Sequence, residues 1–568
     1  MPLLSLKNLS VDFSTENGTV HAVSGISFSL EAGKTIGIVG ESGSGKSVTS
    51  LALMGLLPAG ISKIVAGSAL FTHKDGHQAD LFSLSEKQQQ QIRGNEIAMI
   101  FQEPMTSLNP VYKCGRQVAE AIKLHQHLNK TALKEQVLHW FREVKLPDPE
   151  KAYQSYPHEL SGGQRQRVMI AMAMSCKPSL LIADEPTTAL DVTVQKNILE
   201  LMKRLQEKYA MSIIFISHDL GVIAEIADEV LVVYKGNVVE QGAVGNLFKN
   251  PQHPYTQGLL ACRPKLDVRY TSLPTVDSFM NEGAKHSPHI ITKEERQTDL
   301  ERIFKFPPML EVTHLKTYFK LHSGMFSRTK KEFKAVDDVS FTVHPGETLG
   351  LVGESGCGKT SLGRTVLRLI EPTAGKIVFF GKEISAYSRE QLRKTRKDIQ
   401  IIFQDPYSSL NPRLTVGAAI TEAMRIHRIG NSTAERKQLC CELLAEVNLD
   451  AGFFHRYPHE LSGGQRQRIC IARALALKPK FIICDESVSA LDVSVQAQVL
   501  NLLNKLKAEY GFSVIFISHD MSVVKYMSDR MMVMKNGKIV EYGDPDDICN
   551  APQTAYTKQL IDSIPKGL

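Results

Sequence analysis

The sequence lacks a long hydrophobic run. The longest stretch without a polar side chain, Leu51–Ile61, is interrupted by Gly55, Pro58 and Gly60, whereas a membrane-spanning helix needs roughly 20 apolar residues. The first residues, Met1–Lys7, also lack the basic start and the continuous apolar core of a secretory signal. We therefore expect a cytosolic protein, or one that is held at a membrane by something else.

The sequence also has only a small excess of basic over acidic residues, and its cysteines show no pairing pattern. The 67 Lys and Arg residues exceed the 60 Asp and Glu residues by a net charge of only +7. That balance suits a nucleotide or an anionic membrane face and excludes a nucleic-acid-binding arm. The nine cysteines are scattered, and Cys440–Cys441, the one close pair, has neither zinc-site nor disulfide-framework spacing. A composition of 43% hydrophobic and 22% charged residues excludes collagen-like and disordered chains.

What the sequence does contain is a long internal repeat. The segment IGIVGESGSGKSVT at 36–49 is matched by LGLVGESGCGKTSL at 349–362. The twelve residues YPHELSGGQRQR occur without change at 156–167 and again at 457–468. Because such identity does not arise by chance over this length, we predict a duplicated or fused domain.

The repeat divides the chain into three parts. We predict a first domain over 1–262, a linker over 263–308 and a second domain over 309–568. The linker is polar and ends in two prolines, and its segment ITKEERQTDLERIF at 291–304 predicts one short helix.

Short apolar runs predict buried parallel strands in an α/β core, because they alternate with helical patterns. These runs are Thr35–Val39, Leu180–Ala183 and Ser212–Ile216 in the first unit, and Thr348–Val352, Phe481–Cys484 and Ser513–Ile517 in the second.

Each unit carries the motif G-x-x-x-x-G-K-[ST] between a predicted strand and a predicted helix. Glycines let backbone N–H groups surround phosphate oxygens, and the helix N-terminus adds a favourable dipole. The lysine reaches the β- and γ-phosphates, and the hydroxyl of Ser47 or Thr360 binds Mg²⁺. The alternative is a glycine-rich turn without a ligand. The motif residues are Gly40, Glu41, Ser42, Gly43, Ser44, Gly45, Lys46 and Ser47, and Gly353, Glu354, Ser355, Gly356, Cys357, Gly358, Lys359 and Thr360.

Two carboxylates end a later strand in each unit. They are Asp184 and Glu185 in the first unit, and Asp485 and Glu486 in the second. The first carboxylate of each pair can hold Mg²⁺ through water, and the second can orient and deprotonate the water that attacks a phosphoryl group. The alternative is a strand that ends in solvated acids.

Further motifs resemble those of one family. LSGGQ occurs at 160–164 and 461–465, each copy is followed by DEPTTALD or DESVSALD, and SHD occurs at 217–219 and 518–520. In this order each unit resembles the nucleotide-binding domain of ABC transporters, and the resemblance covers the chain outside the linker. It implies two tandem P-loop NTPase domains, each with a RecA-like core, an antiparallel β subdomain and an α-helical subdomain over about 111–159 or 413–460.

The resemblance implies two ATP molecules between head-to-tail domains, here within one chain. The first P-loop would face the signature residues Ser462, Gly463, Gly464 and Gln465, and the second would face Ser161, Gly162, Gly163 and Gln164. An SGG sequence by itself is equally typical of an ordinary helix N-cap.

Other site residues follow from the same resemblance. Gln102 and Gln404 match the glutamine that touches Mg²⁺ and water, and His218 and His519 match the histidine that contacts the γ-phosphate. Asp191 and Asp492 match the aspartate that communicates across the dimer. Phe13 and Phe319 align with the aromatic residue that stacks on adenine, although an early-strand aromatic is also typical of a core.

The second unit departs from the pattern at two positions, Ser487 in place of proline and Cys357 inside the P-loop. Neither removes a catalytic group, so we predict two hydrolytically competent sites. Glu185, Glu486, His218, His519, Gln102 and Gln404 form the expected catalytic set. Ser47, Thr360, Asp184, Asp485, Gln102 and Gln404 form the expected magnesium set, with ATP and Mg²⁺ as cofactors.

The sequence around these motifs resembles the ATPase subunits of dipeptide and oligopeptide importers. The resemblance lies in FQEPMTSLNP, ALDVTVQ and the tail motif HPYTQGLL at 253–260. The fused arrangement is similar to that of glutathione and microcin-type peptide systems. This implies two membrane permease subunits, an extracytoplasmic solute-binding protein and a place at the cytoplasmic face of the inner membrane, with no nucleic acid as partner. A soluble tandem ATPase that acts on ribosomes or DNA, and a transporter for a non-peptide solute such as nickel, stay open as alternatives.

Overall fold

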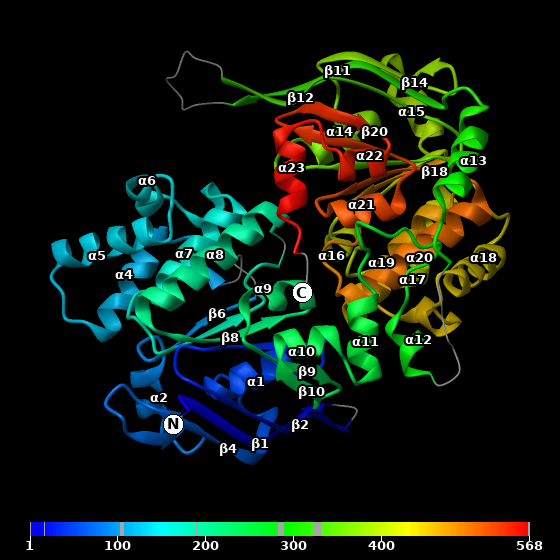
Figure 1. Ribbon diagram of the computed structural model, residues 1–568. Coiled ribbons are helices and arrows are strands. Elements are labelled where there is room, and N and C mark those ends of the chain that lie inside the picture. The colour runs from blue at the N-terminus through cyan, green and yellow to red at the C-terminus, as the bar shows by residue number, and fades with distance from the viewer. Residues whose placement is uncertain are drawn as a thin grey trace.

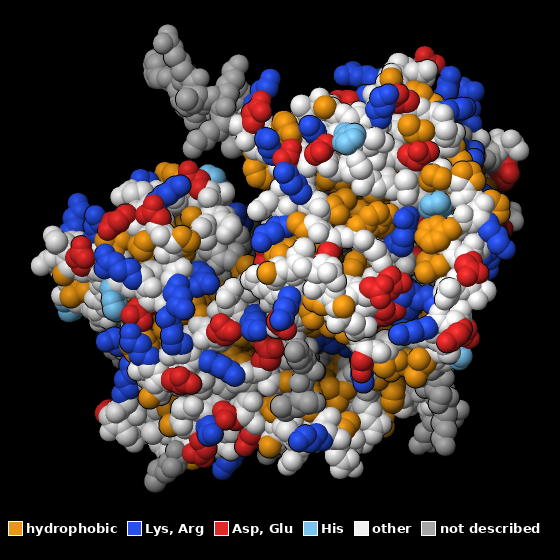
Figure 2. Space-filling model, turned by 45° about the horizontal axis from the view of Figure 1, so that its top comes forward, with side chains coloured by type: hydrophobic (Ala, Val, Ile, Leu, Met, Phe, Trp, Pro, Cys, Tyr) orange, Lys and Arg blue, Asp and Glu red, His pale blue; other side chains and the backbone are white. Residues whose placement is uncertain are grey.

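Two units of the same architecture lie side by side in the protein (Figure 1). The computed structural model describes residues 2–15, 18–102, 107–188, 190–281, 289–321 and 331–565, with the side chains of Leu321 and Lys331 left aside. Lys and Arg side chains are interspersed with Asp and Glu over the face shown in Figure 2, in keeping with the small net charge. Over the described residues, no helix combines the length and apolarity that a bilayer crossing requires.

An antiparallel sheet begins each unit. In the first unit its strand order is β2-β1-β4-β5, and in the second it is β12-β11-β14-β15. The strands are β1 (Leu4–Thr15), β2 (Gly18–Leu30), β4 (Ser62–Thr72), β5 (Gln78–Asp80), β11 (Leu310–Leu321), β12 (Lys331–Val343), β14 (Ala374–Phe379) and β15 (Lys382–Glu383).

A second sheet of six strands forms the centre of each unit, in the order β10-β9-β3-β8-β7-β6 and, in the second unit, β20-β19-β13-β18-β17-β16. All its neighbouring strands are parallel except the antiparallel edge strands β10 and β20. The strands are β3 (Thr35–Val39), β6 (Ile97–Ile100), β7 (Leu180–Asp184), β8 (Ser212–Ser217), β9 (Glu229–Tyr234), β10 (Asn237–Ala243), β13 (Thr348–Val352), β16 (Ile399–Ile402), β17 (Phe481–Asp485), β18 (Ser513–Ser518), β19 (Arg530–Lys535) and β20 (Lys538–Gly543).

The predicted α/β class is confirmed, and each of the six predicted strands is found with its bounds moved by at most one residue. These strands are fully buried, as expected for parallel strands that are covered on both faces. Because their carboxyl ends share one edge of the sheet, the motif residues that follow them are brought together there.

Helices surround the sheets. In the first unit they are α1 (Lys46–Leu53), α2 (Glu86–Ile92), α4 (Cys114–His125), α5 (Lys130–Glu143), α6 (Pro149–Gln154), α7 (Gly162–Met174), α8 (Val192–Tyr209), α9 (Leu220–Ile226), α10 (Val244–Lys249) and α11 (Pro254–Ala261). In the second they are α14 (Lys359–Val366), α15 (Arg389–Thr395), α16 (Pro406–Ser409), α17 (Val416–Ile426), α18 (Thr433–Glu446), α19 (Gly463–Leu475), α20 (Val493–Tyr510), α21 (Met521–Met527), α22 (Pro545–Asn550) and α23 (Ala555–Asp562). The predicted helical subdomains correspond to α4–α6 and α17–α18.

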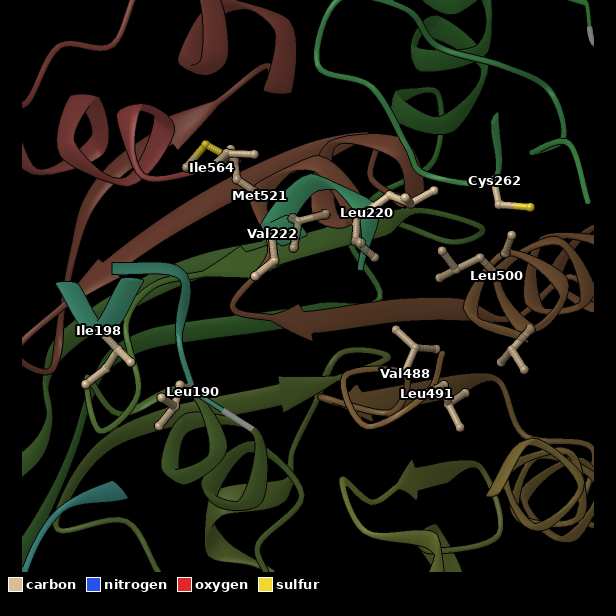
Figure 3. Packing of buried hydrophobic residues seen from close by; sticks show 14 of the residues in the cluster. Leu190, Ile198, Leu220, Val222, Cys262, Val488, Leu491, Leu500, Met521 and Ile564 are labelled. Atoms are coloured by element: carbon tan, nitrogen blue, oxygen red, sulfur yellow. The ribbon is translucent and has the colours of Figure 1, made fainter. Parts of the chain in front are cut away.

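One hydrophobic core continues across the boundary between the units. The same buried cluster contains Leu190 and Val222 of the first unit and Leu491, Met521 and Ile564 of the second. Figure 3 shows side chains of this cluster from both halves of the chain. Because burial of apolar surface is the main stabilising force in a fold, the two units are packed as one body.

The predicted linker lies against the second unit instead of forming a free tether. It contains α12 (Val276–Met280) and the predicted helix, which is observed as α13 (Lys293–Phe304). Figure 1 shows α11 and α12 beside α20, and α13 beside the second unit. The domain boundaries at 262/263 and 308/309 stay predictions; α11 ends at Ala261 and β11 begins at Leu310.

Candidate active sites

The first P-loop (residues 40–47) connects β3 to α1, and the second (residues 353–360) connects β13 to α14. Gly43 and Gly45 have φ values of +81° and +102°, which side-chain-bearing residues rarely adopt. A Cβ atom on Gly40 would lie 2.1 Å from the Val233 carbonyl oxygen, and one on Gly353 would lie 2.3 Å from that of Met534. Glycine is therefore required for the loop to pass the neighbouring strand.

The P-loop lysines are buried and point along their own loops. Lys46 Nζ donates to the carbonyl oxygens of Gly40 and Glu41 at 2.7 and 2.8 Å. Lys359 Nζ makes the same two bonds and lies 3.4 Å from the Glu486 carboxylate. Burial lowers the pKa of Lys46, although the charges of Glu185 and Asp492 oppose this shift. Each loop thus holds one desolvated cation where phosphate groups would bind.

A hydroxyl and a carboxylate lie together beside each P-loop. Ser47 Oγ donates to Asp184 at 3.1 Å, and Thr360 Oγ1 donates to Asp485 at 2.9 Å. Burial raises the pKa of Asp184 to about 6 and also raises that of Asp485. These hard oxygen donors form the candidate cation-binding pairs, as the sequence predicts.

Three side chains contact the same oxygen of the Glu185 carboxylate. Its Oε2 lies 3.0 Å from Thr188 Oγ1, 3.1 Å from Gln102 Nε2 and 3.2 Å from His218 Nδ1. Burial alone would raise its pKa, but the hydrogen bond and charge of His218 and the charge of Lys46 outweigh burial and lower the pKa to about 2. The carboxylate is therefore ionised and can orient a water molecule as a hydrogen-bond acceptor.

The second unit repeats this arrangement. Glu486 Oε2 accepts from Gln404 Nε2 at 2.8 Å and lies 3.7 Å from His519 Nδ1. Burial raises its pKa, but His519 and Lys359 lower it below the ordinary value. Both units thus bring together the glutamate, the glutamine and the histidine that the sequence predicts as a catalytic set.

Both glutamates have an unusual backbone conformation, with φ values of +47° at Glu185 and +46° at Glu486. A non-glycine residue in this region costs about 1–3 kcal/mol and persists where surrounding structure enforces it. Here the backbone N–H of Glu185 donates to Ile216 at 3.0 Å, and that of Glu486 donates to Ile517 at 3.0 Å. The turn aims each carboxylate at the histidine that follows the adjacent strand.

The two units contact each other at the P-loops. Asp492 accepts from Ser42 N–H at 2.8 Å and from Ser42 Oγ at 3.1 Å, and it lies 4.0 Å from His218. In the other direction, Asp191 accepts from Ser355 N–H at 3.4 Å. The structure therefore places each predicted cross-dimer aspartate on the opposite P-loop, in a head-to-tail arrangement.

The signature residues are placed at the starts of α7 and α19. Ser161 Oγ accepts from Gln164 N–H at 3.3 Å, and Ser161 N–H donates to Gln164 Oε1 at 3.1 Å; Ser462 and Gln465 repeat this capping box. The glycines between them, Gly162, Gly163, Gly463 and Gly464, form the first turns. The hydrogen bonds described for these residues lie within their own unit, so the pairing with the opposite P-loop stays a prediction.

The two predicted adenine-stacking residues differ in environment. Phe13 is half-buried and packs against the core of the first unit, whereas Phe319 is 39% exposed. The neighbouring Tyr318 donates its hydroxyl to Asp337 at 2.5 Å and lies under Lys334 Nζ. Their role in stacking on adenine stays a prediction.

Residues that the sequence reasoning missed also lie in the sites. Thr188 contacts Glu185, and Ser494 Oγ donates to the Glu41 carboxylate of the opposite unit. Tyr255 and Tyr556 accept the N–H groups of Glu41 and Glu354, each at 3.0 Å. The signal in the sequence is the motif HPYTQGLL, which contains Tyr255 and is echoed around Tyr556 in PQTAYTKQL.

Known protein families and relatives are similar to this chain. The family model described as ABC transporter matches residues 23–188 and 336–489, and the model described as oligopeptide/dipeptide transporter, C-terminal region, matches 239–286 and 540–567. The glutathione import ATP-binding protein GsiA of Pectobacterium atrosepticum is 48% identical, over 99% of this chain and 89% of that protein. The protein of the same name from Salmonella choleraesuis is 49% identical over the same shares. A solved structure, the dimeric post-hydrolysis state of the ATP-binding cassette MJ0796, is 28% identical, covers 42% of this chain and 99% of that chain, and has a TM-score of 0.38.

Proposed function

Because this chain belongs to the ABC transporter family, we propose that it is the ATP-hydrolysing motor of an importer for glutathione or a related small peptide. The observation that supports the ATPase activity is the pair of sites that each bring together a P-loop lysine, a glutamate with a lowered pKa, a histidine and an aspartate from the opposite unit. Residues 239–286 and 540–567 match the model described as oligopeptide/dipeptide transporter, C-terminal region, which supports a peptide as the substrate.

Different residues of the first site have different roles in ATP hydrolysis. Lys46 and the backbone N–H groups of the first P-loop bind the phosphates of ATP, and Glu185 accepts a hydrogen bond from the attacking water. As the water oxygen bonds to the γ-phosphorus, the bond from that phosphorus to the ADP oxygen breaks, and the water proton passes to the released phosphate. His218, whose pKa is lowered by burial but raised overall by the hydrogen bond and charge of Glu185, can donate a hydrogen bond to the γ-phosphate and stabilise the developing negative charge.

The residues beside the P-loops also fit Mg²⁺, which we propose as the bound cation. Ser47 with Asp184, and Thr360 with Asp485, would hold it, with Gln102 and Gln404 nearby. Among the described residues, the second Asp485 oxygen is buried without a hydrogen-bond partner, as expected of a ligand position. When bound, the ion supplies positive charge that neutralises the β- and γ-phosphates.

Partners and location extend the same proposal. We propose that two membrane permease subunits dock between each P-loop core and its helical subdomain, α4–α6 or α17–α18, and that an extracytoplasmic protein delivers the substrate. This places the chain at the cytoplasmic face of the inner membrane. The support is that its relatives are named import ATP-binding proteins.

The test is to reconstitute the chain with its permeases in liposomes and to measure ATP hydrolysis and uptake of labelled glutathione. We expect glutathione with its binding protein to stimulate both activities, and the double variant Glu185→Gln, Glu486→Gln to abolish both. Stimulation by ribosomes or DNA, with none by glutathione or any short peptide, would contradict the proposal. Stimulation by nickel alone would replace the peptide substrate with a metal ion.

A further inference from the structure

Each unit's C-terminal tail, which is α11 with the start of the linker as far as Leu273 in the first unit and α23 in the second, reaches its own P-loop through a tyrosine. The Tyr255 hydroxyl on α11 accepts the backbone N–H of Glu41 at 3.0 Å, and the Tyr556 hydroxyl on α23 accepts that of Glu354 at 3.0 Å. Both tyrosines are buried, and both glutamates are the second residue of their loop. The contact occurs in both units, whose tails share the pattern P-Q-x-x-Y-T around the tyrosine.

The surroundings fix the direction of both rings. The ring of Tyr255 lies 4.3 Å from that of Tyr234, centroid to centroid. At the corresponding place in the second unit, Lys535 Nζ lies 4.5 Å from the Tyr556 ring. A different partner therefore covers each ring while the hydroxyl keeps the same target, which indicates that the hydrogen bond to the P-loop is the shared feature.

The other end of each tail contacts the opposite unit. Helix α11 contacts α20, and the Asn501 side chain on α20 bonds both the N–H and the carbonyl oxygen of Leu273, each at 2.8 Å. Likewise α23 contacts α8, where Lys196 Nζ donates to the carbonyl oxygen of Asp562 at 2.9 Å. Helices α20 and α8 are those that directly follow the cross-unit aspartates.

The start of the first P-loop is consequently held from two sides. Tyr255 of its own tail holds the N–H of Glu41, while Ser494 of the opposite unit donates to the Glu41 carboxylate. Asp492 holds the next residue, Ser42. An N–H group fixed in this way cannot turn away from the loop, so the loop keeps the shape in which it receives phosphate.

We propose that Tyr255 and Tyr556 are positioning residues that preorganise the two P-loops for nucleotide, and that each tail ties its loop to the opposite unit. The proposal deepens the ATPase function and rests on it. Neither tyrosine touches the reacting atoms. Loss of the hydroxyl should weaken binding of ATP and of the transition state equally, because the whole loop loosens, and should leave the chemical step itself intact.

The test uses the purified full-length chain and the variants Tyr255→Phe and Tyr556→Phe, which keep the ring and remove the hydroxyl. Hydrogen–deuterium exchange is measured in peptides that contain the Glu41 or Glu354 amide, together with KM and kcat for ATP. We expect amide exchange and KM to rise by about threefold to tenfold, as for the loss of one buried hydrogen bond, with kcat unchanged within about twofold. Wild-type exchange together with a wild-type KM would overturn the proposal.

Three further variants separate positioning from general stability. Tyr234→Phe removes the hydroxyl of the ring beside Tyr255 and should change neither exchange at Glu41 nor KM. Asn501→Ala removes the far contact of the first tail and should also raise exchange at Glu41, whereas Lys505→Ala, at an exposed position on the same helix, should not. An unchanged Glu41 amide in Asn501→Ala would overturn the tie to the opposite unit. A lowered melting temperature with normal KM in the Tyr→Phe variants would show a structural role only and would also overturn the proposal.

Failure of the ATPase function itself would look different. If the wild-type chain neither binds nor hydrolyses ATP, KM and kcat can be measured for none of the variants. The exchange of the Glu41 and Glu354 amides still reports directly on the two tyrosine hydrogen bonds in that case.

Discussion

Arg296 on α13 fastens the linker to the second unit, and its replacement by methionine should release that segment. Its guanidinium donates to Asp544 at 2.7 and 3.0 Å and also bonds Asp546. The Arg296 side chain is only 12% exposed, and those of Asp544 and Asp546 are 31% and 28% exposed. Arg296→Met keeps the aliphatic stem and removes this ion-pair network.

The cost can be worked out from these contacts. Breaking a fully buried ion pair costs about 3–5 kcal/mol, because one charge is left uncompensated. Here the aspartates keep part of their hydration, and Asp546 retains its ion pair with Lys525 at 2.7 Å. We therefore expect Arg296→Met to lower the free energy of unfolding by about 2 kcal/mol. For a unit of this size, that corresponds to a fall in melting temperature of about 4–8 °C.

Arg302 on the same helix offers a matched control. It is 75% exposed and pairs with Asp299 at 3.2 Å within the helix, an interaction worth about 0.5 kcal/mol or less. The assay is digestion of the full chain by endoproteinase Glu-C, whose sites at Glu294, Glu295 and Glu301 are intact in both variants, combined with thermal unfolding. Arg296→Met should be cut faster and melt earlier than Arg302→Met; equal cleavage and equal melting would refute the reasoning.

The pH dependence supplies a second check on the same contact. Burial raises the pKa of Asp546, but the hydrogen bond and charge of Lys525 and the charges of Arg296 and Arg269 lower it below the ordinary value of 3.8. A carboxyl group with a lowered pKa stabilises the fold at a pH above its unfolded pKa, and the effect is lost as the pH falls through the folded pKa. The difference between Arg296→Met and wild type should therefore persist at neutral pH and shrink below about pH 4.

Three further predictions concern the sites. In a chain whose second site is inactivated by Glu486→Gln, adding Glu185→Gln should lower the remaining turnover by about 100-fold or more while equilibrium ATP binding is kept, because it removes the acceptor that orients water; phosphate release close to that of the Glu486→Gln single variant would contradict this role. Asp492→Ala should lower kcat/KM by about tenfold and Asp191→Ala by about threefold or less, since Asp492 holds its P-loop by two bonds of 2.8 and 3.1 Å and Asp191 by one of 3.4 Å. Equal losses in steady-state assays would refute that ranking. Cys357→Ser should keep the KM for ATP within about twofold, because Ser44 lies at the matching place beneath Gly40, as Cys357 lies beneath Gly353; a larger change would show that the thiol has a function of its own.

The fold and the inner part of each site could be predicted from the sequence because their determinants are local. The P-loop glycines, Lys46 and Ser47 follow one another on a strand, a turn and a helix start, so spacing alone fixes their arrangement. Glu185 and His218 both follow strands that are parallel neighbours, β7 and β8, and therefore meet at the same sheet edge.

Contacts between remote segments could not be predicted in the same way. Tyr255 and Glu41 are 214 residues apart, and no periodicity or spacing relates them. The docking of the linker depends on Arg296 meeting Asp544 and Asp546, three residues that look like ordinary surface charges in the sequence. The left-handed backbone of Glu185 is likewise invisible in the sequence, because glutamate does not favour that conformation and only the tertiary contacts enforce it.

The two sites carry the same catalytic glutamate, glutamine and histidine, but the opposite unit contacts their P-loops differently. The first P-loop is bonded by Asp492 and by Ser494 of the opposite unit. At the matching place on α8, the Thr193 hydroxyl is buried and has no hydrogen-bond partner among the described residues, and the Asp191 contact is longer. A buried hydroxyl without a partner is costly, and it would gain one if the second site closed as far as the first. The second site is therefore the one with free energy still to be gained on closure, which makes it the site where nucleotide binding should produce the larger movement.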